Sequence, residues 1–408
     1  MAYFNPFQLF ILSVLAIHVN TALPSSCTNH SSLVSPALTK FSTSLYQATS
    51  KAVGKYDNVI VSPSSIALVL AITLVGARGN TTKQIKQALH MMDETDATIS
   101  CTIGAFNRNI KSNGVNLKSM NRVLVSDDFR LTEAFRSTVQ NQFDVLAENV
   151  NFSLPSTLEA INKQIEKSTN GKIKDLIPSG SLGASTKMIL TNAIYFKGNW
   201  LKAFDSSRSR IRPFYVGHQL KMMPTKMMAS RSYFRRAFIK EADAQALELL
   251  YSGSQFSMII ILPNRYNGLA RIESLLSSKL LSLIDSKLSK TLIDVVIPKF
   301  KFESSPDVKR VLRNVGIIDL FNADADLSGI SGSKELYVSD AYHRAFIEVN
   351  EKGTEAAAVT AFRFVARSFR PTPFIPKFVA DHPFLFIVRD RRSQEILFMG
   401  RFCKPEKH

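Results

Sequence analysis

The residues best suited to chemistry lie between positions 351 and 376, near the C-terminal end of the chain. A basic peptide bond, Arg367-Ser368, lies within this stretch, and prolines follow it at positions 371, 373 and 376. Proline removes a backbone donor and opposes regular structure, so we expect this bond in an accessible surface loop. The chemistry on offer is that of a bond presented for cleavage.

The first half of this stretch has two interpretations. Its alanines favour a helix, because alanine has the highest helix propensity. A period of two instead predicts a strand with small and then aromatic residues on one face, and Glu355 and Arg363 on the other. Small side chains fit between existing strands, and Gly353 supplies the backbone freedom of a hinge. The residues on the first face are Thr354, Ala356, Ala358, Thr360, Phe362 and Phe364.

Catalytic motifs are missing from the sequence. It contains no GxSxG elbow, no HExxH, no GxxxxGK[ST] and no GxGxxG after a strand. A Ser-His-Asp triad on an unrelated fold stays open, because triads are set by geometry and not by spacing. An enzymatic function therefore has no motif to support it, and the sequence indicates no cofactor and no metal site.

The composition is that of a soluble globular protein. The chain has 408 residues, of which 45% are hydrophobic and 21% charged, with a formal net charge of +18. A basic cluster between residues 202 and 240 could bind heparin-like polyanions through counterion release, and the alternative is a solvated surface. No nucleic-acid module accompanies it, so nucleic acid is not an expected partner. The cluster includes Arg208, Arg210, Arg212, Lys221, Lys226, Arg231, Arg235 and Arg236.

Residues 1–22 have the features of a signal peptide, since an apolar run begins at Phe7 and is too short to span a membrane. The alternative is a buried N-terminal helix. No later stretch reaches about 18 apolar residues, so we expect the mature chain, 23–408, to be secreted without a membrane anchor.

Three Asn-x-Ser/Thr sequons agree with secretion, and the cysteines allow at most one intrachain disulfide. The sequons are Asn29, Asn80 and Asn151, and the cysteines are Cys27, Cys101 and Cys403.

The periodicity of the sequence predicts an α+β fold. Residues 36–53 have helical spacing, and a short strand before Ser62 leads into a helix that is apolar on all sides and therefore central. Ser62 is its expected N-cap and Pro63 suits its first turn. Helices and strands are mixed without regular alternation or repeats, which favours one large domain over residues 23–408. Further strands are expected at 115–125, 144–152, 188–196, 256–262, 292–302, 384–388 and 396–402, and helices at 131–139, 158–167 and 269–288.

Several segments closely resemble landmarks of the serpin family, in serpin order. Residues 350–360, Asn-Glu-Lys-Gly-Thr-Glu-Ala-Ala-Ala-Val-Thr, resemble the serpin hinge signature. The other landmarks are Asn58-Val-Ile-Val-Ser-Pro-Ser-Ser-Ile, Thr191-Asn-Ala-Ile-Tyr-Phe-Lys-Gly-Asn-Trp, Ile297-Pro-Lys-Phe, and Asp381-His-Pro-Phe-Leu-Phe-Ile-Val-Arg-Asp with Phe398-Met-Gly-Arg-Phe.

The resemblance implies a serpin fold with three β-sheets, eight or nine helices and an exposed reactive-centre loop at about 351–376. In such inhibitors a protease cleaves the loop and becomes covalently acylated. The loop then inserts as a new strand in the central sheet and carries the enzyme away, distorting its active site. A monomer without cofactors, consumed by one protease molecule, is the expectation.

The scissile bond follows from the length of the family's loop. In inhibitory relatives the scissile residue is the seventeenth from the Glu that opens the hinge, and counting from Glu351 leads to Arg367. Arginine there complements the acidic specificity pocket of trypsin-like proteases through charge-assisted hydrogen bonds. Arg363 and Arg370 compete, but cleavage there would make the loop four residues shorter or three longer than usual.

The resemblance also assigns three groups of residues to the control of insertion. The hinge consists of Glu351, Gly353, Thr354, Glu355, Ala356, Ala357, Ala358, Val359 and Thr360. The shutter, beneath the central sheet, consists of Ser62, Ser65, Asn192 and His343. The breach, where the loop first enters, consists of Trp200, Lys299 and Glu351.

Two departures from the family pattern concern activity. Residues 368–383 are longer and richer in proline than in many relatives, and residues 101–111 lack the basic face of heparin-activated members. A non-inhibitory serpin acting as a carrier, storage or polyanion-binding protein is the main alternative. Such relatives carry bulky, charged or proline residues in the hinge, which the run after Thr354 lacks.

Overall fold

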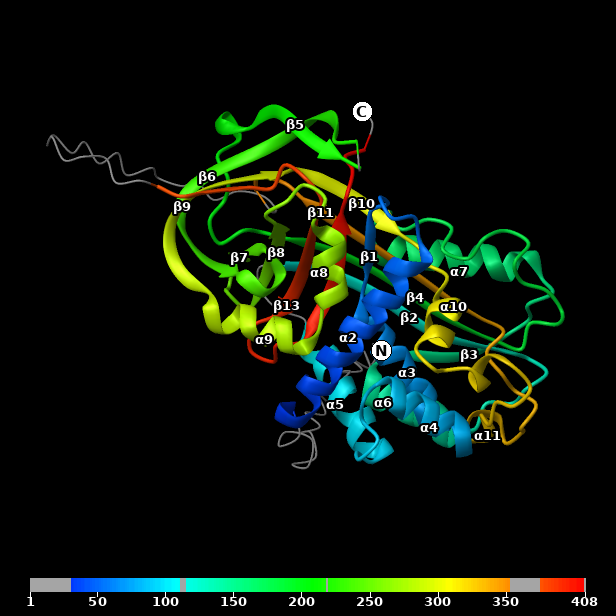
Figure 1. Cartoon of the computed structure of the whole chain (residues 1–408). Coiled ribbons are helices and arrows are strands. Elements are labelled where there is room, and N and C mark those ends of the chain that lie inside the picture. The colour runs from blue at the N-terminus through cyan, green and yellow to red at the C-terminus, as the bar shows by residue number, and fades with distance from the viewer. Residues whose placement is uncertain (1–30, 111–114, 218, 353–374, 407–408) are drawn as a thin grey trace, which may run out of the picture.

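The computed structural model describes residues 31–110, 115–217, 219–352 and 375–406, which form mixed sheets surrounded by helices (Figure 1). This confirms the predicted α+β class. The helices are α2 Ser31–Ala52, α3 Pro63–Gly76, α4 Gly79–Ala88, α5 Asp96–Asn109, α6 Glu133–Phe143, α7 Pro155–Ser168, α8 Leu269–Leu275, α9 Ser278–Lys287, α10 Val308–Asn314 and α11 Ser328–Ser331. Single 3-10 turns occur at η1 Ser206–Arg208, η2 Lys240–Ala242 and η3 Asp319–Phe321.

The described strands form two hydrogen-bonded sheets. The five-stranded sheet has the order β10-β11-β4-β2-β3, and the nine-stranded sheet runs β1-β14-β13-β8-β7-β6-β9-β12, with β5 paired to β6. Strands of the first sheet are β2 Val115–Ser126, β3 Leu146–Val150, β4 Met188–Gly198, β10 Phe300–Ser304 and β11 Asp340–Val349. Those of the second are β1 Val59–Val61, β5 Arg210–Val216, β6 Lys221–Ile239, β7 Ala244–Leu250, β8 Phe256–Pro263, β9 Ser289–Pro298, β12 Lys377–Val379, β13 Phe384–Asp390 and β14 Ile396–Phe402.

The resemblance implies three sheets, whereas the described strands form two. Strand β6 is the reason for this difference. This strand has 19 residues, and pairs with β5 near its start, with β9 in its middle and with β7 at its end. Its unbroken backbone ladder therefore joins two groups of strands into one network. The third sheet of the prediction is continuous with the second.

Two predicted elements are divided in the structure. The helix expected at 269–288 is two helices, because Ser277 caps α9 by accepting a hydrogen bond from the Leu280 backbone amide. This division helps to bring the described α-helices to ten, against the eight or nine expected. The strand expected at 292–302 is split between β9 and β10, which lie in different sheets, with Lys299 between them.

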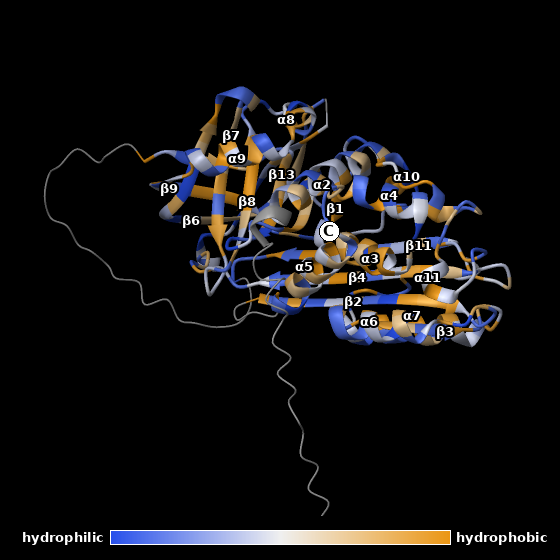
Figure 2. Cartoon of the chain, turned by 90° about the horizontal axis from the view of Figure 1, so that it is seen from below, coloured by the Kyte–Doolittle hydropathy of each residue, from blue (hydrophilic) through white to orange (hydrophobic). Residues whose placement is uncertain are grey.

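The five-stranded sheet is covered on both faces. Phe196 of β4 packs in an aromatic-rich cluster with Phe398 of the other sheet, their ring centroids 5.6 Å apart. On the opposite face, Leu124 packs with Ile161 and Ile165 of helix α7. Figure 2 shows β11, β4 and β2 side by side, and β2 changes from hydrophilic to hydrophobic along its length. The sheet is therefore a buried layer at one end of β2 and more open at the other.

Helix α3 occupies the centre of the helical layer, as its sequence predicts. Twelve of its 14 residues are buried, and Ser62 accepts a hydrogen bond from the Ser65 backbone amide at the N-terminus. The predicted cap and the predicted central position are both confirmed. Within the described part of the chain, none of the helices combines the length and apolar character needed to cross a membrane.

Candidate functional site

Strands β4 and β11 meet at the centre of the five-stranded sheet, and they run parallel. Asp340 pairs with Ile189 at one end of the contact and Ile347 with Phe196 at the other. Their outer neighbours, β2 and β10, are antiparallel to them. The chain leaves β11 at Val349 and re-enters the described structure at residue 375, next to β12 in the other sheet. The candidate site comprises this parallel pair and the side chains at its middle and its end.

His343 of β11 lies at the middle of the pair, directly opposite Asn192 of β4. The Ser62 backbone amide donates to its Nε2 at 3.2 Å, so Nδ1 carries the proton and donates to Asn192 Oδ1. The ring is 2% exposed, and burial lowers the pKa of His343 to about 3. It is therefore a neutral histidine with both ring nitrogens hydrogen-bonded.

The chain of hydrogen bonds continues across the sheet. Asn192 Nδ2 donates to Oδ1 of Asn121, which stands opposite it on β2. Ser62, which gives its backbone amide to His343, has its hydroxyl 3.4 Å from that of Ser64. A continuous hydrogen-bond network therefore joins the end of β1 to β11, β4 and β2. The network lies between two hydrophobic clusters.

The four predicted shutter residues come together here. Ser62 and Ser65 lie at the start of α3, and Asn192 and His343 lie on facing strands. Asn121 was missed by the sequence analysis, because its place beside Asn192 depends on the register of β2 against β4. The control of strand separation by these residues stays a prediction.

The second group lies where β11 ends. Glu351 is 7% exposed and forms an ion pair with Lys299, with 2.7 Å between its Oε2 and the lysine Nζ. Ser209 donates to the other carboxylate oxygen at 2.8 Å. Burial opposes ionisation of Glu351, but the hydrogen bonds from Lys299 and Ser209 outweigh it, and its pKa is lowered. The carboxylate is held in its charged form.

Trp200 completes the predicted breach. Its indole N–H donates to the Asn350 carbonyl at 2.9 Å, and its ring stacks on Tyr251 with centroids 4.5 Å apart. The Phe204 backbone amide donates to the Glu351 carbonyl, also at 2.9 Å. The segment that follows β4 therefore holds the backbone of both residues that follow β11. Ser209 is the partner that sequence analysis missed, because nothing in its local pattern points to residue 351.

Several predicted residues lie outside the described part of the chain. They are Gly353 to Thr360 of the hinge, the Arg367-Ser368 bond, the 1–22 leader and Asn29. Asn80 lies in the first turn of α4 and Asn151 in the turn after β3, and both are exposed. Buried Cys403 is a free thiol, while Cys101 of α5 is disulfide-bonded.

The basic cluster is only partly free. Arg231 forms two hydrogen bonds with Asp294, at 2.6 and 2.7 Å, and Arg235 forms an ion pair with buried Glu248. Arg236 is buried. The remaining members are exposed along η1, β5 and the start of β6, and polyanion binding by them stays a prediction.

Comparison with known proteins identifies the family. The model of the serpin family, described as serine protease inhibitors, matches residues 36–405. This chain is a serpin. It is 35% identical to human Serpin B3 and to pig leukocyte elastase inhibitor, in each case over 91% of this chain and 99% of the relative. The crystal structure of uncleaved ovalbumin superposes with a TM-score of 0.83 at 28% identity, covering 91% of this serpin and all of ovalbumin. The resemblance drawn from the motifs is confirmed.

Proposed function

We propose that this serpin is a secreted suicide-substrate inhibitor of trypsin-like serine endopeptidases, cleaved at Arg367-Ser368. The protease becomes covalently trapped when the cleaved loop inserts between β4 and β11. The relatives named as serpins and as a leukocyte elastase inhibitor support the general activity, since the family model is described as that of serine protease inhibitors.

The parallel pairing of β4 with β11 is the observation that carries the proposal. A strand that turns back after Val349 would run antiparallel to β11, and therefore antiparallel to β4 as well. Insertion would replace one parallel contact by two antiparallel ones, which are slightly more stable per residue. About 15 inserted residues would extend roughly 50 Å, at about 3.3 Å each. Cleavage frees the loop to move in this way, which gives the intact protein a source of stored energy.

Arg367 decides the class of protease in this proposal. A guanidinium at the scissile position pairs with a carboxylate at the base of a specificity pocket, and a small apolar pocket would leave it unpaired. The relative from pig is named for elastase, so we expect this serpin to differ from it in target. A basic-directed protease of an extracellular cascade is the expected partner.

Secretion is supported by three features of the chain. The leader at 1–22 and the sequons are typical of secreted proteins, and Asn80 and Asn151 are exposed. Cys101 is disulfide-bonded, and disulfides persist mainly in oxidising compartments. Expression in a secreting host should yield a chain that begins near residue 23 and loses mass on treatment with an N-glycosidase.

Reaction with trypsin tests the proposed mechanism. We expect an SDS-stable complex, a released C-terminal peptide that begins at Ser368, and a cleaved protein that resists heat better than the intact one. Arg367→Gln should abolish the complex, while the matched variant Arg363→Gln should keep it. Cleavage after Arg363 or Arg370 would overturn the assignment of the bond.

The face of the hinge that becomes buried can be tested separately. Thr354→Arg places a charge on the face that must enter the sheet, so cleavage should continue while the complex is lost. Glu355→Arg, on the opposite face, is the matched control and should keep inhibition. Cleavage without any complex or gain in heat resistance in the unmodified protein would favour a non-inhibitory serpin.

A further inference from the structure

A pocket of about 300 Å³ lies beside the breach, between the segment that follows β4 and the strands β6 and β7. Its walls are mainly apolar and include Trp200, Leu201, Phe204, Tyr233 and Leu249. Leu201 and Tyr233 are about half exposed, at 49% and 53%. Large apolar side chains around a concave surface are typical of a small-molecule site, and this volume is at the small end of the range for such sites.

The charges around the pocket are mainly positive. Lys202 and Lys290 are exposed, and Lys290 Nζ stands 5.6 Å from the centre of the Tyr233 ring. Lys202 Nζ donates to Ser232 Oγ at 2.9 Å and to the Tyr233 carbonyl at 3.3 Å, which holds the ammonium near the pocket.

Glu248 is the acidic residue among those that line the described pocket, and its charge is already compensated. Its side chain is fully buried, with oxygens 2.7 Å from Arg235, 3.5 Å from Arg389 and 3.4 Å from Arg391. Arg389 also pairs with Asp285 at 2.6 Å, so these three guanidiniums face two carboxylates and one positive charge remains. An entering anion therefore meets no net repulsion.

We propose that this pocket binds a small amphipathic monoanion, with an apolar chain or ring against Trp200 and Leu249 and a carboxylate or sulfonate near Lys202 and Lys290. Burial of the apolar part removes Leu201 and Tyr233 from water, which favours binding. The head group stays close to both ammonium groups at the rim, and charge-assisted contacts are stronger than contacts between neutral groups. A neutral ligand of the same shape gains only the first of these two contributions.

Occupancy of the pocket is coupled to the root of the reactive-centre loop. The same segment that forms one wall donates from Trp200 to the Asn350 carbonyl and from Phe204 to the Glu351 carbonyl. The Leu201 backbone amide donates to the Leu250 carbonyl of β7 at 2.8 Å, which fixes the same segment to the opposite wall of the pocket. A ligand that fits the present position of this wall stabilises the uninserted state relative to the inserted one. This coupling rests on the proposed inhibitory function, whereas the binding itself does not.

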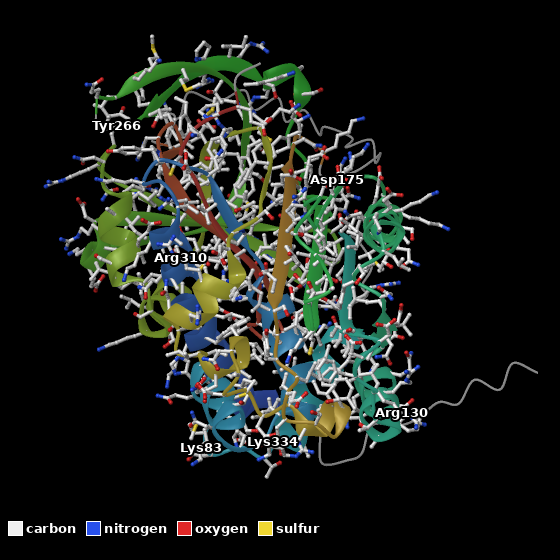
Figure 3. All side chains as sticks on the ribbon, turned by 90° about the vertical axis from the view of Figure 1, so that its right-hand side faces the viewer. Lys83, Arg130, Asp175, Tyr266, Arg310 and Lys334 are labelled. Carbon is white, nitrogen blue, oxygen red and sulfur yellow. The ribbon has the colours of Figure 1, made fainter. Side chains whose placement is uncertain are left out.

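Binding can be measured directly, because Trp200 is the only tryptophan of the chain. Titration with decanoate should give a saturable change in tryptophan emission, and decanol should bind at least tenfold more weakly. The pair Lys202→Gln/Lys290→Gln should lower the affinity for decanoate at least tenfold. The matched pair Lys83→Gln/Lys334→Gln removes the same charge from α4 and from the segment after α11, neither of which lines the pocket (Figure 3). This pair should leave the affinity for decanoate unchanged.

Three results would overturn the site: no saturable change in emission, equal binding of decanol, or equal loss in both lysine pairs. The coupling is tested by adding decanoate at saturation to the reaction with trypsin. We expect at least a twofold rise in the number of serpin molecules consumed per trypsin molecule inhibited. An unchanged stoichiometry, with binding intact, would refute the coupling alone. If no complex forms without decanoate, the proposed function fails and the binding result still stands.

Discussion

The shutter and the breach hold the same pair of strands by different physical means. At the shutter, His343, Asn192 and Ser62 are buried and neutral, and each hydrogen bond satisfies a group that has no access to water. At the breach, Lys299 is 30% exposed and pairs with a carboxylate that Ser209 also binds. Loss of a partner in the first region leaves a buried polar group unsatisfied, whereas water can replace part of the second.

The two regions also differ in where they lie along the β4–β11 contact. The buried network lies halfway along the β4–β11 contact and must break for a strand to enter. The breach contacts lie at the end of β11, where a loop would enter first, and their ion pair is partly exposed on the Lys299 side. We therefore expect the shutter to set how firmly the sheet stays closed, and the breach to set where opening begins.

The largest effect should come from His343→Ala. It leaves the Ser62 amide and the Oδ1 of Asn192 without their histidine partner and creates a cavity, at a cost of about 3 kcal/mol in the free energy of unfolding. His343→Gln, which can keep one hydrogen bond, should lose less. Urea unfolding measures both losses. An unchanged midpoint for the alanine variant would contradict the claim that the buried shutter network contributes strongly to stability.

Acid should weaken the shutter before the breach. The pKa of His343 is depressed to about 3, so between pH 6.5 and 3 the unfolded chain binds a proton that the folded chain does not. Stability should fall as pH decreases toward and through this window, by about 2 kcal/mol between pH 7.5 and 5. The pKa of Glu351 is lowered in the folded protein, so its carboxylate stabilises the fold at any pH above the ordinary pKa of a glutamate. This stabilisation is lost only in stronger acid.

Urea midpoints of the unmodified protein and of His343→Gln at pH 7.5 and 5.0 test this order. The difference between the two proteins should shrink at pH 5.0, because the variant lacks the group that resists protonation. A pH dependence shared equally by both proteins would assign it to other groups.

Trp200→Phe should have an intermediate effect. It removes the hydrogen bond to the Asn350 carbonyl but keeps an aromatic ring against Tyr251, at a cost of about 1–2 kcal/mol. Hydrogen exchange at the amides of β11 should accelerate near Val349 and stay slow near His343. Equal acceleration along the strand would mean that the two regions open together.

The smallest effect should come from Lys299→Met. The partly exposed pair with Glu351 contributes about 0–1 kcal/mol, and Ser209 continues to bind the carboxylate. Urea unfolding should detect little change, and 0.5 M salt should reduce the stability difference between the unmodified protein and the variant. A loss above 2 kcal/mol would show that the breach is as strongly buried as the shutter.

Much of this serpin could be predicted from local sequence. The cap of α3 by Ser62 depends on one residue and the turn after it, and the all-apolar run of α3 could only be central. The family follows from short motifs whose order along the chain is preserved. The hinge beyond Lys352 and the candidate scissile bond were drawn from the same motifs, and they stay predictions because they lie outside the described residues. Such features are local, so they need no knowledge of which strands pair.

Contacts between distant residues were decided only by tertiary structure. Asn121 and Asn192 are 71 residues apart, and Ser209 and Glu351 are 142 apart, so only strand register and chain path bring them together. The joining of the sheets through β6 and the pocket beside Trp200 likewise depend on which strands become neighbours. Sequence alone determined the family and the local elements, because backbone propensity and motif order act over a few residues. Packing decided the rest, because a hydrogen bond forms only where the fold places two groups within about 3 Å of each other.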